Sequence, residues 1–273
     1  MTTASELAAQ TIADFGEQWA RYPTHEGYFA SVELFEDIVS PLLCRSELNG
    51  ALVAEIGSGA GRIVGMLLDS GAKQVYAIEP APCQSLADNV NGMARGRDVS
   101  IINCRGDVWT VPELLDFVIA IGVIDHIPEP TPVLKRAYDS LRPGGRMLIW
   151  VYGREGNELY LNLVEPLRKI TKRLPHLCLT MVVELMYAAL VCYRALSRFF
   201  RLPLRSYIEN VLWHFSPSHR RLVIYDQLKP AYAKYYRKEE AIQLLLDAGF
   251  VNVLAYHRHG YSWTIIGTKP LTV

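Results

Sequence analysis

The chain has 273 residues, half of them hydrophobic and 21% charged, and its formal net charge at pH 7 is zero. This composition is that of a globular protein rather than a disordered one, and the lack of a basic excess argues against nucleic-acid binding. Five scattered cysteines without paired spacing argue against a disulfide framework or a zinc site and are typical of a reduced, cytosolic protein.

The first ten residues lack a basic region followed by an apolar core, so we expect no signal peptide. Two helices are predicted before the first strand, over residues 4–20 and 31–43. The segment between them, together with the end of the first helix, is rich in aromatic residues. Such a segment commonly packs on a core.

Residues 51–62 predict a short buried strand, a glycine-rich turn and the start of a helix. Residues 51–56 are apolar except for Glu55, as in a central parallel strand covered on both faces. Glycines at 57, 59 and 61 let the backbone turn tightly and let a ligand approach the main chain. A second apolar run, residues 75–78, ends in Glu79. A carboxylate at that position suits the two hydroxyls of a ribose.

The glycine spacing differs from the dinucleotide fingerprint, because the sixth position holds Arg62 instead of glycine. Glu55 would also repel a phosphate, whereas it suits a cationic ligand. Residues 55–61 together with Glu79 resemble the class I S-adenosylmethionine-dependent methyltransferases. The alternative is a turn whose glycines serve packing only. The resemblance implies that S-adenosylmethionine is the cofactor and that the following residues contact it: Glu55, Gly57, Ser58, Gly59, Gly61, Arg62, Glu79 and Pro80.

In many members of that family, helices before the first strand close over the cofactor. The resemblance therefore implies a lid formed by Trp19, Arg21 and Tyr22. An aromatic face stabilises a sulfonium, and a guanidinium pairs with the methionine carboxylate. The alternative, given equal weight, is an arm that packs on the core with Arg21 in solvent.

After Glu79 we predict a helix over residues 82–91 and a third strand over 99–104. The resemblance implies that Asp107 accepts the adenine amino hydrogen and that the backbone of Val108 contacts the ring. The alternative is an Asx turn at the strand end. A fourth strand is predicted over residues 115–122, and Ile121 near its end is a further candidate for cofactor contact.

Asp125 and His126 follow the fourth strand, where ligands bind beyond the carboxyl ends of parallel strands. An imidazole there can act as a general base near neutral pH. The alternative is that it only braces the loop. A helix over residues 131–141 and a Leu-x-Pro-Gly-Gly turn, a second hallmark of the family, lead to a strand over 147–152. Its last residue, Tyr152, is the third catalytic candidate.

The C-terminal part predicts an amphipathic helix over residues 238–248 and two strands over 251–256 and 261–267, which a short connector makes antiparallel. We therefore expect an α/β fold, a Rossmann-like seven-stranded mixed sheet of the class I methyltransferase type with an N-terminal helical lid and a large α-helical insertion. The predicted units are the lid, 1–49, the core, 50–152 and 237–273, and the cap insertion, 153–236.

The insertion is predicted to be helical and carries an uneven charge. Residues 166–222 contain ten Lys or Arg and two acids, whereas the rest of the chain has a net charge of −8. Residues 177–193 are apolar on every face except at Thr180 and Glu184, and because this run has 17 residues and a central glutamate we do not expect it to span a bilayer. We expect a cap over the acceptor site, apolar inside and basic at its mouth, with Glu184 facing the protein or the cleft. The alternative is a helix at a membrane interface.

The predicted reaction is transfer of the sulfonium methyl group to a small or amphipathic acceptor, anionic and lipid-linked acceptors included, without a metal ion. Two alternatives stay open. One is an enzyme that attacks another sulfonium carbon and releases methylthioadenosine, by cyclisation to azetidine-2-carboxylate or by aminocarboxypropyl transfer. The other is a non-catalytic S-adenosylmethionine-binding module. We expect no nucleic-acid partner, a cytoplasmic location and at most peripheral contact with the inner membrane face, while the sequence carries no signal for the oligomeric state.

Overall fold

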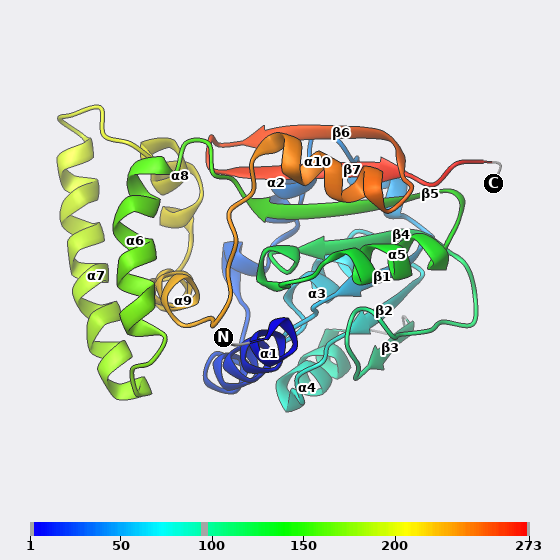
Figure 1. Ribbon diagram of the computed structural model, residues 1–273, viewed down its shortest axis with the longest axis horizontal. Coiled ribbons are helices and arrows are strands. Elements are labelled where there is room, and N and C mark those ends of the chain that lie inside the picture. Colours follow the sequence, from blue (N-terminus) through cyan, green and yellow to red (C-terminus); the bar gives the residue numbers. More distant parts are fainter. Residues whose placement is uncertain (1–2, 94–97, 272–273) are drawn as a thin grey trace.

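The computed structural model describes residues 3–93 and 98–271, and its centre is a twisted sheet covered by helices on both faces (Figure 1). The strand order is β3-β2-β1-β4-β5-β7-β6, in which β7 runs antiparallel to its two neighbours and the other pairs are parallel. The predicted seven-stranded mixed sheet is thereby confirmed. The strands are β1 (Leu52–Ile56), β2 (Gln74–Ile78), β3 (Asp98–Ile102), β4 (Leu115–Ile121), β5 (Leu141–Tyr152), β6 (Val251–Arg258) and β7 (Ser262–Thr268).

The sheet is buried on both faces because side chains alternate along each strand. In β1, Val53 packs on one face with helices α2, α3 and α4, while Ala54 and Ile56 pack on the other with α5 and α10. This two-sided burial explains why the sequence of β1 is an almost continuous apolar run. The helices of the core are α2 (Val32–Val39), α3 (Arg62–Asp69), α4 (Gln84–Met93), α5 (Thr131–Ser140) and α10 (Lys238–Asp247).

The start of β5 differs from the predicted boundary. The segment Leu141–Gly145, expected to be a turn, is the first part of β5, and Leu141 pairs with Leu115 of β4. The register then shifts between Leu115 and Phe117, so the strand contains an irregularity at the glycine pair. Gly144, with φ of +79°, adopts the left-handed conformation that this irregularity requires.

Helix α1 (Ala4–Arg21) begins with a capping box between Thr3 and Glu6 and runs beside the carboxyl ends of the parallel strands (Figure 1). Its inner side buries Asp14 and Gln18, which are polar. Asp14 accepts a hydrogen bond from the backbone of Ala231 at 3.0 Å. The N-terminal helix is therefore held by chain segments far away in sequence.

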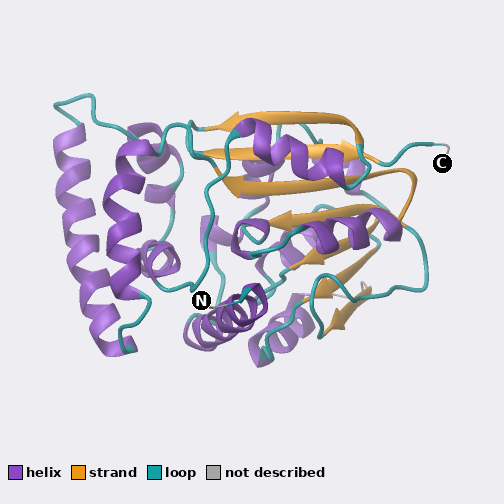
Figure 2. Ribbon diagram, viewed as in Figure 1, coloured by secondary structure: helices purple, strands orange, loops and turns teal. Residues whose placement is uncertain are grey.

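The segment between β5 and α10 forms a helical extension at the end of the molecule opposite the C-terminus (Figure 2). It leaves and rejoins the sheet at one point, because Gly153 and Tyr236 form a parallel bridge and Tyr236 donates to the carbonyl of Tyr152 at 2.9 Å. Its helices are α6 (Glu158–Thr171), α7 (His176–Ser197), α8 (Arg205–Asn210) and α9 (Pro217–Leu228). Both α6 and α7 pack on α9.

Candidate functional site

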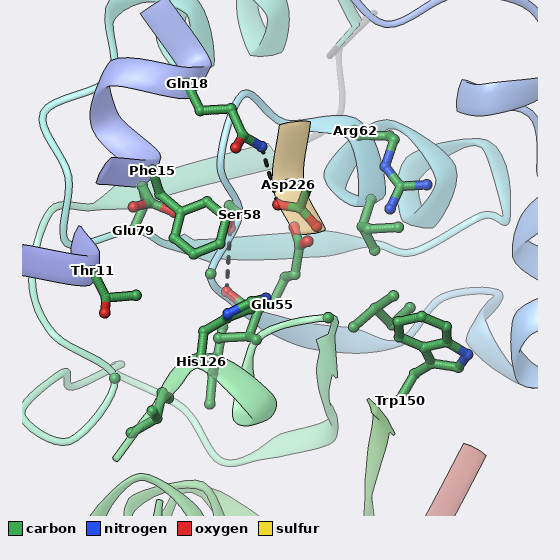
Figure 3. Close-up of a pocket in the computed structure, with 18 of the residues that line it drawn as sticks. Thr11, Phe15, Gln18, Glu55, Ser58, Arg62, Glu79, His126, Trp150 and Asp226 are labelled. Carbon is green, nitrogen blue, oxygen red and sulfur yellow. Dashed lines mark hydrogen bonds between the residues drawn. The ribbon is translucent and has the colours of Figure 1, made fainter. Parts of the chain in front are cut away.

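A pocket of about 310 Å³ opens at the carboxyl ends of the parallel strands, between the sheet, α1 and the helical extension (Figure 3). This is the place where α/β sheets bind ligands. The lining is mainly apolar and aromatic, with a few convergent charged groups, as in small-molecule sites. The charged residues of the lining are Glu55, Glu79, Asp107, Glu129, Asp226, Arg62, Arg105 and Arg258, and its polar residues include Gln18 and His126.

The turn after β1 brings its backbone to the floor of this pocket. Gly57 and Gly59 have φ values of +76° and +54°, a region that residues with a Cβ rarely occupy. A Cβ on Gly57 would lie 2.4 Å from Val123, and one on Gly59 would lie 2.8 Å from the ring of Trp19. Both glycines are therefore required by packing as well as by backbone conformation.

Glu79, at the end of β2, is buried and its orientation is determined by two backbone donors. Its Oε2 accepts from the N–H of Gly59 at 2.7 Å, and its Oε1 accepts from Ala81 at 2.9 Å. Burial raises the pKa of this carboxyl above its ordinary value, while the two donors oppose that shift. Each oxygen keeps a further lone pair, so the group is available to accept hydroxyl hydrogens.

Glu55 is the opposite case, because its Oε2 is buried and has no hydrogen-bond partner. Burial raises its pKa from 4.5 to about 8. An unpartnered buried carboxylate is costly unless a ligand satisfies it. This free oxygen can accept from the cationic ammonium of S-adenosylmethionine, and Glu79 is the candidate acceptor for its ribose hydroxyls.

Three arginines line the pocket, Arg62, Arg105 and Arg258, whereas the predicted Arg21 does not. The guanidinium of Arg62 lies 4.4 Å from the centroid of the Phe29 ring, and burial lowers its pKa to about 10. Arg21 is exposed, pairs with Glu17 at 2.5 Å and does not line the pocket. Arg105 and Arg258 are paired with Asp107 and Asp37, so among the lining arginines Arg62 is the candidate to meet a ligand carboxylate.

The two aromatic residues of the predicted lid lie in different places. Trp19 lines the pocket and covers the turn at Gly59. Tyr22 lies outside it, with its ring 6.0 Å from that of Tyr225. The arm therefore packs on the core at one end and covers the pocket at the other.

Of the two predicted adenine contacts, only Asp107 lines the pocket. Both of its carboxylate oxygens accept from Arg105, at 3.0 and 2.8 Å. The side chain of Val108 is 62% exposed, and the residue does not line the pocket. Pro80 and Ile121 are part of the lining.

His126 lines the pocket, but both of its ring nitrogens face protein atoms. Nδ1 lies 3.0 Å from the carbonyl oxygen of Tyr232, which can only accept, so Nδ1 carries the proton. Nε2 lies 3.7 Å from Oδ2 of Asp125. This arrangement favours the alternative in which the imidazole braces the loop.

The other two catalytic candidates differ in access. Asp125 is fully buried behind His126, does not line the pocket, and burial raises its pKa to about 6. Tyr152 lines the pocket, and burial raises its pKa well above the ordinary value. Its phenol therefore stays protonated at neutral pH and can donate a hydrogen bond.

Several lining residues were missed by sequence reasoning. Asp226 of α9 enters the pocket and accepts a hydrogen bond from Gln18 of α1 at 3.2 Å, across 208 residues of sequence (Figure 3). The indole Nε1 of Trp150 is buried in the same region without a partner. No local motif surrounds Asp226, so nothing in the sequence marked it. The extension contributes Tyr207, Val211, Phe215, Leu222, Val223 and Asp226 to the lining.

The predicted basic mouth is wrong. No Lys or Arg of the described extension lines the pocket, and neither does any residue of α7, because α8, α9 and the turn between them form its wall instead. Glu184 does not face the cleft. Its side chain is 51% exposed and pairs with Arg221 of α9 at 2.6 Å. Among the residues that the structure describes, no group of three or more His, Cys, Asp or Glu is arranged to hold a metal ion.

Residues 54–149 match the family model described as a methyltransferase domain. A ubiquinone biosynthesis O-methyltransferase from Xanthomonas euvesicatoria is 28% identical over 112 residues, which are 40% of this chain and 46% of that protein. A tRNA carboxymethyltransferase from Shewanella is 30% identical over 41% of this chain and 35% of that protein. The chain spans about half the length of the curated relatives that it matches first.

Solved structures agree on the fold over nearly the whole chain. The 1,6-didemethyltoxoflavin N1-methyltransferase of Burkholderia thailandensis, with S-adenosylhomocysteine bound, superposes with a TM-score of 0.56 at 16% identity, covering 99% of this chain and 92% of that one. The magnesium protoporphyrin IX methyltransferase of Synechocystis, also with S-adenosylhomocysteine, gives a TM-score of 0.52 at 15% identity and covers 93% of each chain.

Proposed function

The chain belongs, through residues 54–149 and the sheet that carries them, to the class I S-adenosylmethionine-dependent methyltransferases, and from that premise we propose that it methylates a small, mainly apolar or aromatic acceptor bound beside the helical extension. Bound S-adenosylmethionine supplies an electrophilic methyl group on a sulfonium. The nucleophile of the acceptor takes the methyl group, a proton is released and S-adenosylhomocysteine remains. Methyl transfer of this kind requires mainly positioning from the protein.

The observation that carries the proposal is the unpartnered oxygen of Glu55 in the same pocket as Glu79. A buried carboxylate in this position calls for a cation, and the ribose-binding candidate lies beside it. Asp107 at one end of the pocket would hold the adenine. The cofactor would therefore occupy the half of the pocket between Asp107 and Arg62.

The other half of the pocket supports the acceptor assignment. Its walls are Trp150 and Tyr152 from β5 and the apolar residues of α8 and α9. Asp226 offers a hydrogen-bond acceptor, while the indole of Trp150 offers a donor without a partner. A flat or amphipathic molecule with one polar end that carries the nucleophile fits this combination better than an anion, since the extension brings no cation to the pocket and the lining Arg258 is already paired with Asp37.

The names of the relatives point in two directions, a ubiquinone biosynthesis O-methyltransferase and a tRNA carboxymethyltransferase. The apolar lining and the small volume favour a small acceptor over a nucleic acid. Attack on another sulfonium carbon and non-catalytic binding are the outcomes against which the proposal is tested.

The test is mass spectrometry of the nucleoside product after incubation of the protein with S-adenosylmethionine and cell extract. We expect S-adenosylhomocysteine, formed at a rate about tenfold or more lower in Asp226→Asn, with cofactor affinity unchanged because the acceptor alone loses its polar partner. Asp69→Asn, at an exposed site at the end of α3, is the matched control. Methylthioadenosine, or persistent cofactor without turnover, would overturn the proposal.

A further inference from the structure

Helix α7 presents an apolar face to the outside of the molecule. Its inner side buries Leu179 and Val183 against α9. On its outer side Leu177, Met181 and Leu185 are 75, 69 and 73% exposed. The face continues past the helix end through Phe199, which is 82% exposed. We call this surface the outer apolar face, and it consists of Leu177, Met181, Leu185, Leu196, Phe199 and Phe200.

The neighbouring helix α6 repeats the pattern. Leu159, Leu163 and Ile170 are all more than 60% exposed, and their spacing of four and seven residues puts them on one side of the helix. Leu161 and Val164 on the opposite side are buried. Figure 1 draws both helices at the end of the molecule farthest from the C-terminus. Exposed apolar surface of this extent marks an interaction site.

Charges lie at both ends of the outer apolar face. Of the ten Lys or Arg between residues 166 and 222, four are engaged within the protein. Arg168 is buried, Arg194 pairs with Glu209, Arg220 lies over Trp213 and Arg221 pairs with Glu184. The other six have no acid within ion-pair distance in the described part of the chain. Lys169, Lys172 and Arg173 precede α7, and Arg198, Arg201 and Arg205 follow it.

We propose that the outer apolar face docks on an anionic phospholipid bilayer, with α7 lying in the plane of the interface. A helix of 22 residues is roughly 33 Å long. Its apolar side chains would enter the boundary between headgroups and acyl chains, while the cations at its two ends meet lipid phosphates. The acceptor pocket plays no part in this contact, so the inference is independent of the proposed reaction.

Charge argues against a second copy of the chain as the occupant. Both ends of α7 are basic, so parallel and antiparallel pairing of two copies would each bring like charges together. The only acid on the helix, Glu184, is already paired with Arg221. A single-stranded RNA would meet the cations, but it would leave the leucines and Met181 uncovered.

Length and composition alone would allow α7 to cross a membrane, and it is the one helix of the described residues that meets this test. Its packing opposes that reading. Leu179 and Val183 are held against α9, and Glu184 lies near the middle of the helix in an ion pair with α9. A contact from one side keeps these interactions, whereas insertion across the bilayer would break them.

The experiment is flotation of the full chain with vesicles of phosphatidylcholine alone or of phosphatidylcholine mixed with phosphatidylglycerol. We expect binding to the mixed vesicles only, and a loss of binding at high salt because exposed charges are screened. Arg198→Glu and Arg201→Glu should each lower partitioning by about fivefold or more, the effect of one surface cation. Leu185→Glu should abolish it.

Matched control variants distinguish a role of the outer apolar face from general effects of charge or hydrophobicity on vesicle binding. Lys73→Glu and Lys135→Glu change exposed cations elsewhere, and Leu246→Glu changes a leucine of α10 that is 44% exposed. All three should float as the unchanged protein does. No flotation with phosphatidylglycerol at low salt, or binding that ignores both lipid charge and salt, would overturn the proposal. So would a dimer in light scattering that Leu185→Glu dissociates, or tighter binding to RNA that competes with the vesicles.

Discussion

Two buried glutamates at adjacent strand ends differ in the hydrogen-bond partners that the protein provides. Glu79 receives two backbone hydrogen bonds and is held in one orientation without a ligand. Glu55 keeps an oxygen without any partner. Because burial raises its pKa to about 8, Glu55 keeps its proton at neutral pH, and a cation bound beside it would favour the ionised form.

The raised pKa of Glu55 makes stability depend on pH. Because its pKa is about 8 in the folded protein and 4.5 in the reference state, the folded state holds a proton that the unfolded state has lost. Its contribution is fully present below pH 4.5 and disappears as the pH rises to about 8. Urea denaturation across this window should show a decline in the free energy of unfolding that is shallower in Glu55→Gln. Parallel pH profiles for the two proteins would contradict the assignment.

At the scale of one element, α1 contacts both the helical extension and the glycine turn after β1. Asp14 and Gln18 tie it to the extension and to α9, while Trp19 covers the glycine turn. The same helix therefore joins the cofactor half of the pocket to the acceptor half. An exposed residue two positions away, Arg21, belongs to neither.

Removing the Trp19 indole should weaken the affinity for the cofactor. Trp19→Ala is expected to weaken S-adenosylmethionine binding by about tenfold, because the pocket loses apolar cover and an aromatic face for the sulfonium. Arg21→Ala, on the same helix but outside the pocket, is the control and should bind as the unchanged protein does. Calorimetric titration measures both. A large loss in Arg21→Ala with little in Trp19→Ala would restore Arg21 as the ligand contact.

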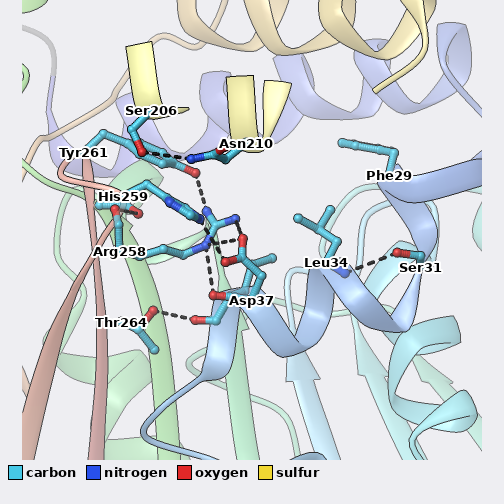
Figure 4. Close-up of polar contacts among 12 residues, drawn as sticks. Phe29, Ser31, Leu34, Asp37, Ser206, Asn210, Arg258, His259, Tyr261 and Thr264 are labelled. Carbon is cyan, nitrogen blue, oxygen red and sulfur yellow. Dashed lines mark hydrogen bonds and ion pairs between the residues drawn. The ribbon is translucent and has the colours of Figure 1, made fainter. Parts of the chain in front are cut away.

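At the scale of the whole molecule, one buried network ties the N-terminal helices to the C-terminal hairpin (Figure 4). Arg258 of β6 is 2% exposed and donates to the carboxylate and the backbone carbonyl of Asp37 in α2, and also to the hydroxyl of Tyr261. His259 lies 2.9 Å from the same carboxylate. Arg258 and Tyr261 also line the pocket, so the network fixes one of its walls.

Breaking this network from one side should cost more than removing both partners. Asp37→Asn leaves the Arg258 guanidinium buried without its counter-ion and should lower the free energy of unfolding by about 2–4 kcal/mol. The double variant Asp37→Asn with Arg258→Met should recover part of that loss, since no buried charge remains. Urea denaturation measures both. An additive or larger loss in the double variant would show that the pair is stabilising in itself.

Much of the sheet was readable from the sequence because its signals are local. The apolar run before Gly57, the positive φ that Gly57 and Gly59 adopt, and the carboxylate about twenty residues later are properties of neighbouring residues. The antiparallel ending also follows from a short connector. The extent of β5 could not be predicted from local signals, because pairing of Leu141 with Leu115 depends on the partner strand.

The sequence by itself therefore determined three local features and their order along the chain: a buried glutamate, a glycine turn and a second glutamate at adjacent strand ends. Only the tertiary structure decided which side chains meet from distant segments. It placed Arg62 in the pocket wall and Arg21 outside it, and it brought Asp226 to Gln18 across 208 residues. It also left one side of α7 uncovered, since an apolar sequence says that a helix needs a partner, while packing alone decides which of its faces the protein itself covers.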